Sequence, residues 1–119
     1  MRWKVAFHDD FESEFDRLSA AVQDAILARA SLLAKIGPSL GRPHADTLNG
    51  SRHTNMKELR FSADDGVWRV AFAFDPGRQA ILLVAGDKAG TSEKRFYRKL
   101  IAVADSRFAQ HLATQRRKQ

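Results

Sequence analysis

The apolar positions in the first third of the chain follow two different periods. Residues 3–7 have large apolar side chains at every second position, which predicts a short strand with alternating faces. In the stretch that follows, apolar residues recur every three or four positions, which is typical of amphipathic helices. Ser19 lies inside this run, and serine is a common N-cap residue. We therefore expect a helical hairpin over about 11–18 and about 20–36.

The predicted hairpin has recognisable ends. Asp9 or Asp10 is a suitable N-cap for its first helix. Gly37 and Pro38 end its second helix, because glycine favours the left-handed stop and proline cannot continue the backbone hydrogen bonds. Residues 37–55 contain glycine, proline and asparagine at short intervals, which predicts a loop. A loop of this length within a compact domain is often functional.

Three strand-like segments follow this loop, at 56–61, 67–74 and 80–85. Turn residues at 64–66 and 75–78 separate them, so we expect antiparallel strands joined by short turns. In the second segment the large apolar side chains alternate with smaller ones and share one face. We expect this face to point into the core, with Trp68, Val70, Phe72 and Phe74.

A last helix is predicted after Thr91 or Ser92, either of which is a suitable N-cap. Its buried stripe is expected to consist of Tyr97, Ile101, Ala104, Phe108 and Leu112. The order is therefore an N-terminal strand, a helical hairpin, antiparallel strands in a small sheet and a C-terminal helix. This is an α+β fold, which we expect to form one domain over residues 1–119. We expect the helices to cover one face of the sheet and to leave the second face open.

The composition is ordinary for a globular protein, with 44% hydrophobic and 29% charged residues. No apolar run approaches the roughly 18–20 residues of a membrane span, and we expect no signal peptide. With no cysteine, the sequence excludes disulfides, thiolate zinc sites and cysteine nucleophiles. We expect a cytoplasmic protein that does not associate with a membrane.

Positive charge is concentrated in the second part of the chain. Residues 1–50 contain six Lys or Arg and seven Asp or Glu, whereas residues 51–119 contain fourteen and seven. A basic half indicates a nucleic acid, an acidic protein partner or a membrane surface as the binding partner. A merely solubilising surface is the alternative.

Several charged residues lie on the predicted strands. Arg69 alternates with the apolar face of its strand and lies among small residues, which predicts a shallow, solvent-facing concavity where its guanidinium can bind phosphate. Pairing of Arg69 with Glu58 across the sheet is the alternative. Glu58 and Arg60 share a face with Met56, so Glu58 is in position to orient the arginines. Lys57 has the parity of the core and lies at the strand edge.

Two more candidates flank these strands. Gly86, which allows a bulge or a close approach, and Asp87 precede Lys88 and place it at the rim of the sheet. His53 is a candidate proton carrier, because histidine titrates near neutral pH; an ordinary loop histidine is the alternative. The four histidines match no zinc spacing. There is no phosphate loop, nucleophile elbow or carboxylate pair, so we expect no metal or other cofactor.

Four segments occur in an ordered set: Leu48-Asn49-Gly50-Ser51, Met56-Lys57-Glu58-Leu59-Arg60, Trp68-Arg69-Val70, and Ile81-Leu82-Leu83 running to Lys88, with a helix after them. In this set the chain resembles type II toxins of the RelE/ParE superfamily, most closely the HigB-like, phage-associated branch. The resemblance covers nearly the whole chain and implies the RelE-like fold.

This resemblance implies an mRNA interferase, a ribosome-dependent endoribonuclease that works without a metal ion. In such toxins the RNA 2′-hydroxyl attacks the adjacent phosphate and leaves a cyclic phosphate and a free 5′-hydroxyl. The resemblance implies that Arg60 and Arg69 bind the phosphate, where cations stabilise the charge of the transition state. Lys57 and Lys88 would stabilise charge or carry protons.

Two further residues take roles from the same resemblance. His53 would be an acid or base, and Tyr97 would stack on the RNA or orient it. The chain departs from the family pattern at Ala89, because many relatives have a second lysine after Lys88. Tyr97 matches the family's catalytic tyrosine only loosely. Both departures concern proton transfer more than phosphate binding.

The resemblance also implies a helix-turn-helix antitoxin of the HigA type as partner, in a toxin–antitoxin hetero-oligomer, besides mRNA and the ribosome. Two alternatives belong to other functional classes. One is a ParE-like toxin that inhibits DNA gyrase by binding it and lacks the catalytic cations. The other is an inactive RNA- or protein-binding module. Arg60, Arg69 and Lys88 together favour the nuclease.

Overall fold

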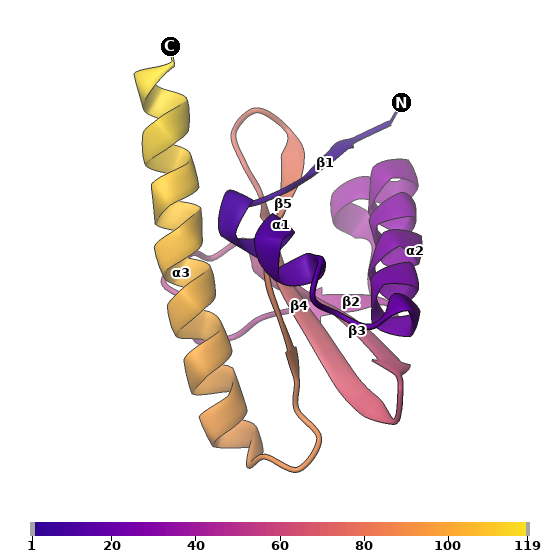
Figure 1. Cartoon of the computed structure of the whole chain (residues 1–119). Coiled ribbons are helices and arrows are strands. Elements are labelled where there is room, and N and C mark those ends of the chain that lie inside the picture. The colour runs from indigo at the N-terminus through magenta and orange to yellow at the C-terminus, as the bar shows by residue number, and fades with distance from the viewer. Residues whose placement is uncertain (1, 119) are drawn as a thin grey trace.

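The computed structural model describes residues 2–118. In that range a five-stranded sheet lies between helices on both of its faces (Figure 1), which confirms the predicted α+β class. The elements in chain order are β1 (Lys4–Phe7), α1 (Asp9–Phe15), α2 (Ala20–Ile36), the short 3-10 helix η1 (Gly37–Ser39), β2 (Ala45–Thr47), β3 (Met56–Ala63), β4 (Gly66–Phe74), β5 (Gln79–Asp87) and α3 (Glu93–Arg117).

The sheet has the strand order β1-β5-β4-β3-β2. The predicted antiparallel pairing of β3 with β4 and of β4 with β5 is confirmed. Asp64 and Asp65 both have positive φ and form the turn of the first hairpin, a geometry that matches the twist of the strands. β1 pairs with β5 in parallel, which makes the sheet mixed.

The prediction of a loop over all of 37–55 is wrong in part. This segment contains η1 and also β2, which pairs antiparallel with β3. A strand of three residues is too short to show an alternating pattern of its own, and its pairing with β3 defines it.

The helix starts agree with the sequence at two places out of three. Ser19 and Ser92 cap α2 and α3, and each hydroxyl accepts a hydrogen bond from a backbone N–H three residues later at 3.3 Å. α1 is capped by His8 instead of Asp9 or Asp10, because His8 Nδ1 accepts from Asp10 N at 3.1 Å. The two aspartates lie in the first turn, where negative charge is favourable.

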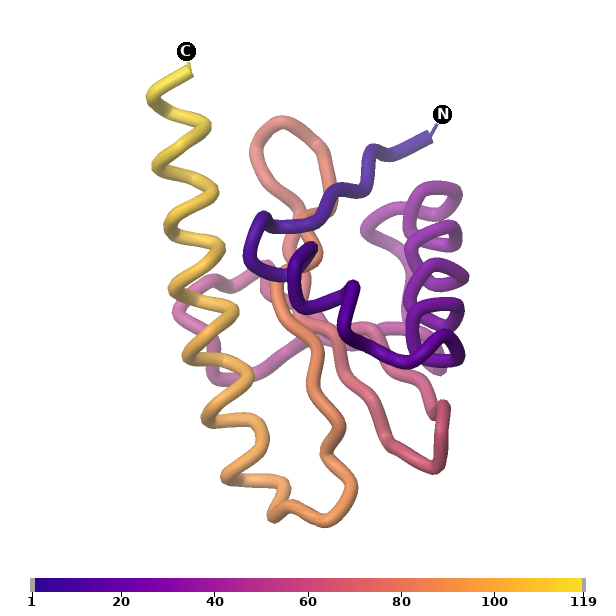
Figure 2. Tube along the Cα trace, viewed as in Figure 1, coloured from indigo at the N-terminus to yellow at the C-terminus, as the bar shows by residue number. Residues whose placement is uncertain are grey.

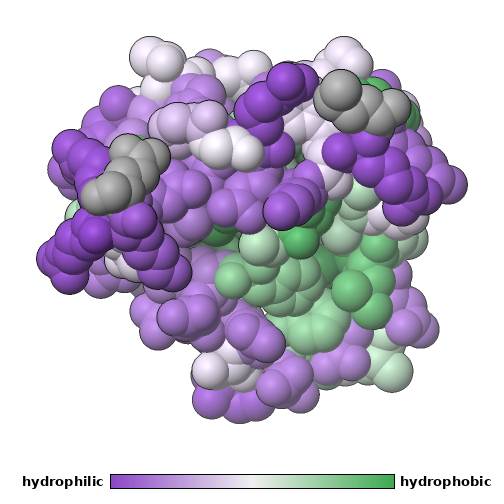
Figure 3. Space-filling view, turned by 90° about the horizontal axis from the view of Figure 1, so that it is seen from above, coloured by the Kyte–Doolittle hydropathy of each residue, from purple (hydrophilic) through white to green (hydrophobic). Residues whose placement is uncertain are grey.

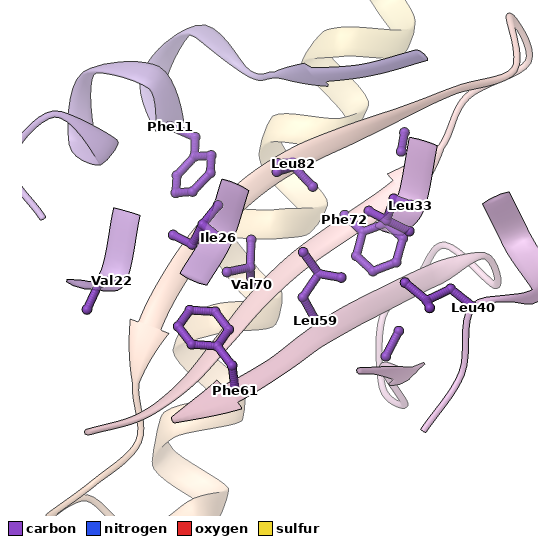
Figure 4. Packing of buried hydrophobic residues seen from close by; sticks show 12 residues of the cluster. Phe11, Val22, Ile26, Leu33, Leu40, Leu59, Phe61, Val70, Phe72 and Leu82 are labelled. Atoms are coloured by element: carbon purple, nitrogen blue, oxygen red, sulfur yellow. The ribbon is translucent and has the colours of Figure 1, made fainter. Parts of the chain in front are cut away.

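The first face of the sheet is covered by α1 and α2. In Figure 4, phenylalanine and aliphatic side chains from these helices point toward those of β3, β4 and β5. The fully buried members include Phe11 and Ile26 from the helices and Leu59, Val70 and Phe72 from the strands. The parity predicted for β4 therefore holds: Val70 and Phe72 are in this core, and Trp68 and Phe74 lie partly buried against it.

The second face is not open, so that prediction is wrong. α3 lies along it and buries Phe96, Leu100, Ala104 and Phe108 in a second core. The sheet contributes Met56, Ala71, Ala73, Ile81 and Leu83, each at most 2% exposed. The physical reason is that small side chains in the middle of β4 let a helix approach the sheet closely, instead of leaving a hollow for a ligand.

Both chain ends lie at the same end of the molecule (Figure 2). Seen from that end, the surface is mostly polar, and an apolar area reaches the surface between the polar residues (Figure 3). Within residues 2–118, none of the helices combines the length and the apolar character that crossing a membrane requires.

Candidate functional site

Three residues form a row across the sheet on the face that α3 covers. Arg60 on β3 is directly opposite Arg69 on β4, and Arg69 is opposite Gly86 on β5. The strand register therefore places the two arginines side by side, on the shared face that their parity predicted. Like charges at directly opposed positions destabilise a sheet unless an opposite charge compensates them.

Glu58 is the compensating charge. It is only 3% exposed, and its Oε2 accepts a hydrogen bond from Arg60 Nη1 at 2.6 Å. Its Oε1 lies 4.0 Å from Arg69 Nε. Glu58 thus pairs directly with Arg60 and more distantly with Arg69. The structure therefore lies between the two alternatives, an Arg69 without an acidic partner and an Arg69 paired with Glu58 alone.

Arg69 is buried, with 6% of its surface exposed, so the expectation of a solvent-facing concavity around it is wrong. Its Nη1 donates to the carbonyl of Trp68 at 2.9 Å, and its Nε donates to the hydroxyl of Tyr97 at 3.2 Å. The cause is again α3, because Tyr97 lies on this helix above the row of arginines. Arg60 is the more accessible of the two, with 21% of its side chain exposed.

Tyr97 is held in place by its neighbour Phe96. A Cβ atom on Gly86 would lie 2.8 Å from Phe96 Cε1, so only glycine leaves room for the ring against the strand. The close approach predicted at Gly86 is thus made by a side chain of α3. The pKa of Tyr97 is raised, first by burial and then by the Glu58 carboxylate, although Arg69 acts in the opposite direction. Its phenol is therefore protonated at neutral pH.

Lys88 lies at the rim of the sheet beside Tyr97. Its backbone N–H donates to the carbonyl of Val67 at 2.8 Å, which fixes the chain directly after β5. Its Nζ is 3.1 Å from a carboxylate oxygen of Glu93 and 6.0 Å from the centre of the Tyr97 ring. Arg60, Arg69, Tyr97 and Lys88 therefore form one connected group, which we call the cationic cluster.

Two adjoining hollows of about 320 Å³ each flank Arg60. Both are lined by Arg42 as well as Arg60; one extends toward Arg69, and the other toward Glu58 and Tyr97. The side chain of Arg42 is 66% exposed and pairs with Asp46 at 2.9 Å. Sequence reasoning missed Arg42, because only the unpredicted strand β2 brings this segment next to β3.

Lys57 does not lie in the cationic cluster. Its side chain projects to the other face of the sheet, where Nζ donates to the carbonyl of Pro38 in η1 at 2.7 Å. This agrees with its parity, which is that of the core residues Leu59 and Phe61.

His53 also lies apart from the cluster. Its ring packs edge-on against Phe108, with 5.0 Å between the ring centres. Phe108 is eleven residues after Tyr97 on α3, which is about 16 Å along the helix axis. His53 is close to β3 in the sequence, but this does not determine where its side chain points. Its ring packs against the second core through Phe108.

The Leu48-Asn49-Gly50-Ser51 segment has a structural role. Leu48 is buried in the second core, and Gly50 has a φ of 97°, which glycine adopts without strain. The Ser51 hydroxyl donates to the buried carboxylate of Asp105, and Arg52 N donates to the same group at 3.1 Å. This carboxylate on α3 fixes the segment that borders one of the two hollows.

Residues 2–118 contain no cluster of three or more His, Asp or Glu side chains that could hold a metal ion. In the cationic cluster, positive charge comes from Arg60, Arg69 and Lys88, and Arg42 lies nearby. The arrangement suits a phosphate group, because guanidinium groups donate paired hydrogen bonds to phosphate oxygens.

Comparison with a known structure gives the fold. The chain is similar to a double arginine-to-alanine variant of the E. coli toxin RelE in its free state, with a TM-score of 0.60 and 11% sequence identity. The match covers 86% of this chain and 96% of that chain. At this identity the likeness shows the fold alone, which is that of the RelE-like toxins.

Sequence comparison gives the family. Residues 13–109 match the family described as "Phage derived protein Gp49-like (DUF891)". The chain is 47% identical over 97 residues to a protein named as toxin HigB2 of Mycobacterium tuberculosis (strain ATCC 25618 / H37Rv), a match that covers 81% of this chain and 48% of that protein. It is 45% identical over 104 residues to a protein named as toxin HigB3 of the same strain, covering 87% and 89%. The chain thus spans about half the length of the first relative and most of the second. It belongs to the Gp49-like family, in the HigB-like branch, and has the fold of the RelE-like toxins.

Proposed function

We propose that this chain is an mRNA interferase, the toxin of a type II toxin–antitoxin system that cleaves messenger RNA on the ribosome. The observation that supports this proposal is the cationic cluster: two arginines at opposed positions on neighbouring strands, with the Tyr97 hydroxyl 3.2 Å from Arg69 Nε and Lys88 next to the Tyr97 ring. The two hollows beside Arg60 offer space for the nucleotides on either side of a phosphate.

The proposed reaction is a transfer within the RNA. The 2′-oxygen attacks the adjacent phosphorus, the O2′–P bond forms, and the P–O5′ bond breaks. The products are a cyclic 2′,3′-phosphate and a free 5′-hydroxyl. The 2′-hydroxyl gives up its proton to water, and the departing 5′-oxygen gains one from the Tyr97 hydroxyl, which then regains a proton from water. Arg60 and Arg69 stabilise the negative charge that grows on the phosphate oxygens, an effect worth about 10²–10³ in rate for one well-placed donor.

The remaining members of the cluster have distinct proposed roles. Tyr97 is protonated and accepts a hydrogen bond from Arg69, and it is the proposed donor of a proton to the departing oxygen, in place of its hydrogen bond to Glu58. Lys88 stabilises charge on the same side. Glu58 orients Arg60 and Arg69, and its single charge leaves them a positive surplus. Since these cations supply the stabilising charge, we propose a metal-independent reaction.

Lys57 and His53 have no direct role in this proposal. Lys57 bonds to Pro38 on the other face of the sheet, and the ring of His53 packs on Phe108. The catalytic and RNA-binding set is therefore smaller than the one that the resemblance implied.

The proposed partners are mRNA with the ribosome, and a cognate HigA-like helix-turn-helix antitoxin in a hetero-oligomer. The excess of positive charge in residues 51–119 supports both, because RNA and an acidic antitoxin surface each complement it. The proposed place of action is the cytoplasm, where messenger RNA is translated.

The test is to map the 5′ ends of cellular transcripts after brief induction. The wild-type chain should produce new ends with a free 5′-hydroxyl. Arg69→Ala and Tyr97→Phe should abolish or strongly reduce them, and Tyr97→Phe removes only one oxygen atom. Arg17→Ala is the matched control, since Arg17 is exposed between α1 and α2.

A second measurement tests the chemistry directly. Replacement of the 2′-hydroxyl by hydrogen at the mapped cleavage site of a ribosome-bound message should stop cleavage there. Growth arrest that persists in Arg69→Ala cells without new 5′ ends would contradict the proposal and favour a ParE-like inhibitor of DNA gyrase. The proposal would also be contradicted if Arg69→Ala relieved growth arrest although the wild-type chain produced no new RNA ends.

A further inference from the structure

The outer edge of β5 is only partly occupied. β1 pairs with β5 at Gln79–Leu82, and β5 continues to Asp87. Beyond Leu82 no strand of residues 2–118 lies on this side. Figures 1 and 2 show β1 and α1 against one end of β5, while the other end, which leads to the turn before α3, has no neighbouring strand on its outer side.

Hydrogen-bond alternation identifies the unpaired backbone groups. The N–H of Lys88 donates to the carbonyl of Val67 in β4. In an antiparallel ladder alternate residues point to the same neighbour, so Gly86 and Val84 also face β4. Ala85 and Asp87 therefore present their N–H and C=O groups to the outer side. These groups form a short free edge, which can pair with another chain.

Up to Leu83, the outer backbone groups of β5 have hydrogen-bond partners within the protein. The Leu83 carbonyl accepts a hydrogen bond from Arg107 Nη1 at 2.8 Å, and Arg107 is held by both carboxylate oxygens of Glu14 in α1. This clamp raises the pKa of Arg107, chiefly through the hydrogen bond to Glu14. The groups of Ala85 and Asp87 lie beyond the clamp and have no such cover.

A groove of about 470 Å³ runs beside the free edge. One wall is β5 from Val84 to Asp87, and the other is the first half of α3. The turn before α3 contributes Thr91, and the helix contributes Arg95, Phe96, Lys99, Leu100 and Val103. The groove thus has an apolar floor. Two cations, Arg95 and Lys99, lie one helical turn apart along it.

The two cations are available to a partner. Arg95 and Lys99 are exposed, and neither forms an ion pair with another residue of the described chain. On a helix with 3.6 residues per turn, both lie about 160–200° around the axis from Tyr97. The groove is therefore on the opposite side of α3 from the cationic cluster and forms a separate site.

We propose that the free edge of β5 at Ala85 and Asp87 binds an extended, acidic segment of a partner protein as an additional strand. The backbone of the segment pairs with these two residues, and its acidic side chains reach Arg95 and Lys99. The apolar side chains between the acidic ones point to the opposite face of the sheet, the face that α1 and α2 cover. Two outward-facing residues correspond to a segment of roughly three to five residues.

Backbone pairing distinguishes this partner from a nucleic acid. An RNA strand can meet the charges of Arg95 and Lys99, but it has no repeating N–H and C=O groups at the spacing of a strand. The free edge and the groove together therefore favour a peptide, and RNA binding becomes one outcome of the test.

The test uses an acetylated and amidated peptide of about six residues with alternating valine and glutamate, added to the full chain labelled with nitrogen-15. We expect chemical-shift changes at the amides of Ala85 and Asp87, and slower exchange of both with solvent. The amides of Val84 and Gly86, already bonded to β4, are the internal reference and should change little. A valine–lysine peptide should bind at least about tenfold more weakly.

Two variants and one altered peptide test the mechanism. Ala85→Pro removes the outward N–H and leaves the bonds to β4 in place, as proline does at sheet edges. Lys99→Glu reverses one of the two charges. Each should weaken binding about tenfold or more. Methylation of the peptide's own amide nitrogens should abolish binding to the unchanged protein, which keeps the test decisive if Ala85→Pro does not fold.

Three results would overturn the proposal: no binding of the valine–glutamate peptide at millimolar concentration, equal binding of the methylated peptide, or shifts confined to Arg60, Arg69 and Tyr97. Single-stranded RNA that shifts the amides of Ala85 and Asp87 while the peptide does not would assign the groove to nucleic acid instead. Transcript cleavage is measured separately, so the nuclease proposal and the strand proposal can fail independently.

Discussion

Replacement of Gly86 by alanine tests whether the packing of the Phe96 ring on Gly86 positions Tyr97 for the proposed reaction. The added Cβ would lie 2.8 Å from Phe96 Cε1 and 3.3 Å from Cζ. Carbon atoms in contact are normally about 3.5–4.0 Å apart. The ring must therefore move by roughly 0.7–1 Å, and Tyr97 is the next residue on the same turn of α3.

The expected effects on stability and on activity differ in size. Overpacking of this kind costs about 1–3 kcal/mol. Alanine recovers about 0.5–1 kcal/mol relative to glycine in a strand. The free energy of unfolding should therefore fall by only about 0–2.5 kcal/mol. A misplacement of about 1 Å near the reacting groups can cost about 10²-fold in rate. Cleavage of RNA should thus be lost to a much greater extent than the fold.

The assay combines urea unfolding with the rate of transcript cleavage in Gly86→Ala, Phe96→Leu and the double variant. Leucine occupies less space, so the double variant should recover part of both losses. The coupling between the two changes should be about 1–2 kcal/mol in stability. Two results would refute the idea that the packing of Phe96 on Gly86 positions Tyr97. One is a Gly86→Ala variant that cleaves RNA at the wild-type rate, and the other is a double variant that recovers neither stability nor cleavage rate.

Three further predictions concern charged residues. Lys57→Met should change transcript cleavage less than about twofold, whereas Lys88→Met should reduce it about 10²-fold, because only Lys88 lies beside Tyr97. Asp105→Ala should lower the free energy of unfolding by about 2–3 kcal/mol in a urea titration, since two donors lose their buried acceptor. Burial raises the pKa of Asp75, but the hydrogen bond with His111 and those from Gln79 outweigh it and leave the pKa lowered. A lowered carboxyl pKa stabilises the fold above the unfolded value of 3.8, and this stabilisation is lost as the pH falls through the folded value. Asp75→Asn should therefore be less stable than the wild type at pH 7 and should lose less stability on acidification, as thermal unfolding at several pH values would show.

Elements with a clear period could be predicted from the sequence. α2 matches the predicted 20–36, and β4 matches the predicted 67–74 within one residue, because each has a long regular pattern. The parity of β3 and β4 also placed Glu58, Arg60 and Arg69 on one face. These inferences depend on local geometry, which the sequence determines directly.

Features that depend on distant parts of the chain could not be predicted. The predicted buried stripe of α3 is right at Ala104 and Phe108 and wrong elsewhere: Phe96 and Leu100 are buried, whereas Tyr97, Ile101 and Leu112 are only partly buried. The small side chains of Ala71 and Ala73 decide which face of the sheet the helix covers. The same alanines led to the wrong expectation of a solvent-facing hollow around Arg69. The contact between Arg69 and Tyr97 joins residues 28 positions apart and has no local pattern.

The cationic cluster is a place where the local rules of stability are not satisfied. Arg60 and Arg69 are opposed on neighbouring strands, and Arg69 is almost fully buried, yet Glu58 is the only carboxylate between them among the described residues. One negative charge against two positive charges leaves a surplus that burial makes unfavourable. A phosphate group would complete the balance, and it would meet donors that need no rearrangement. Natural proteins tolerate such conflicts mainly at functional sites. The structural carboxylate of Asp105 shows the opposite pattern, because Ser51 and Arg52 both donate to it. The uncompensated charge on this face therefore favours an anionic ligand more strongly than the net charge of the chain does.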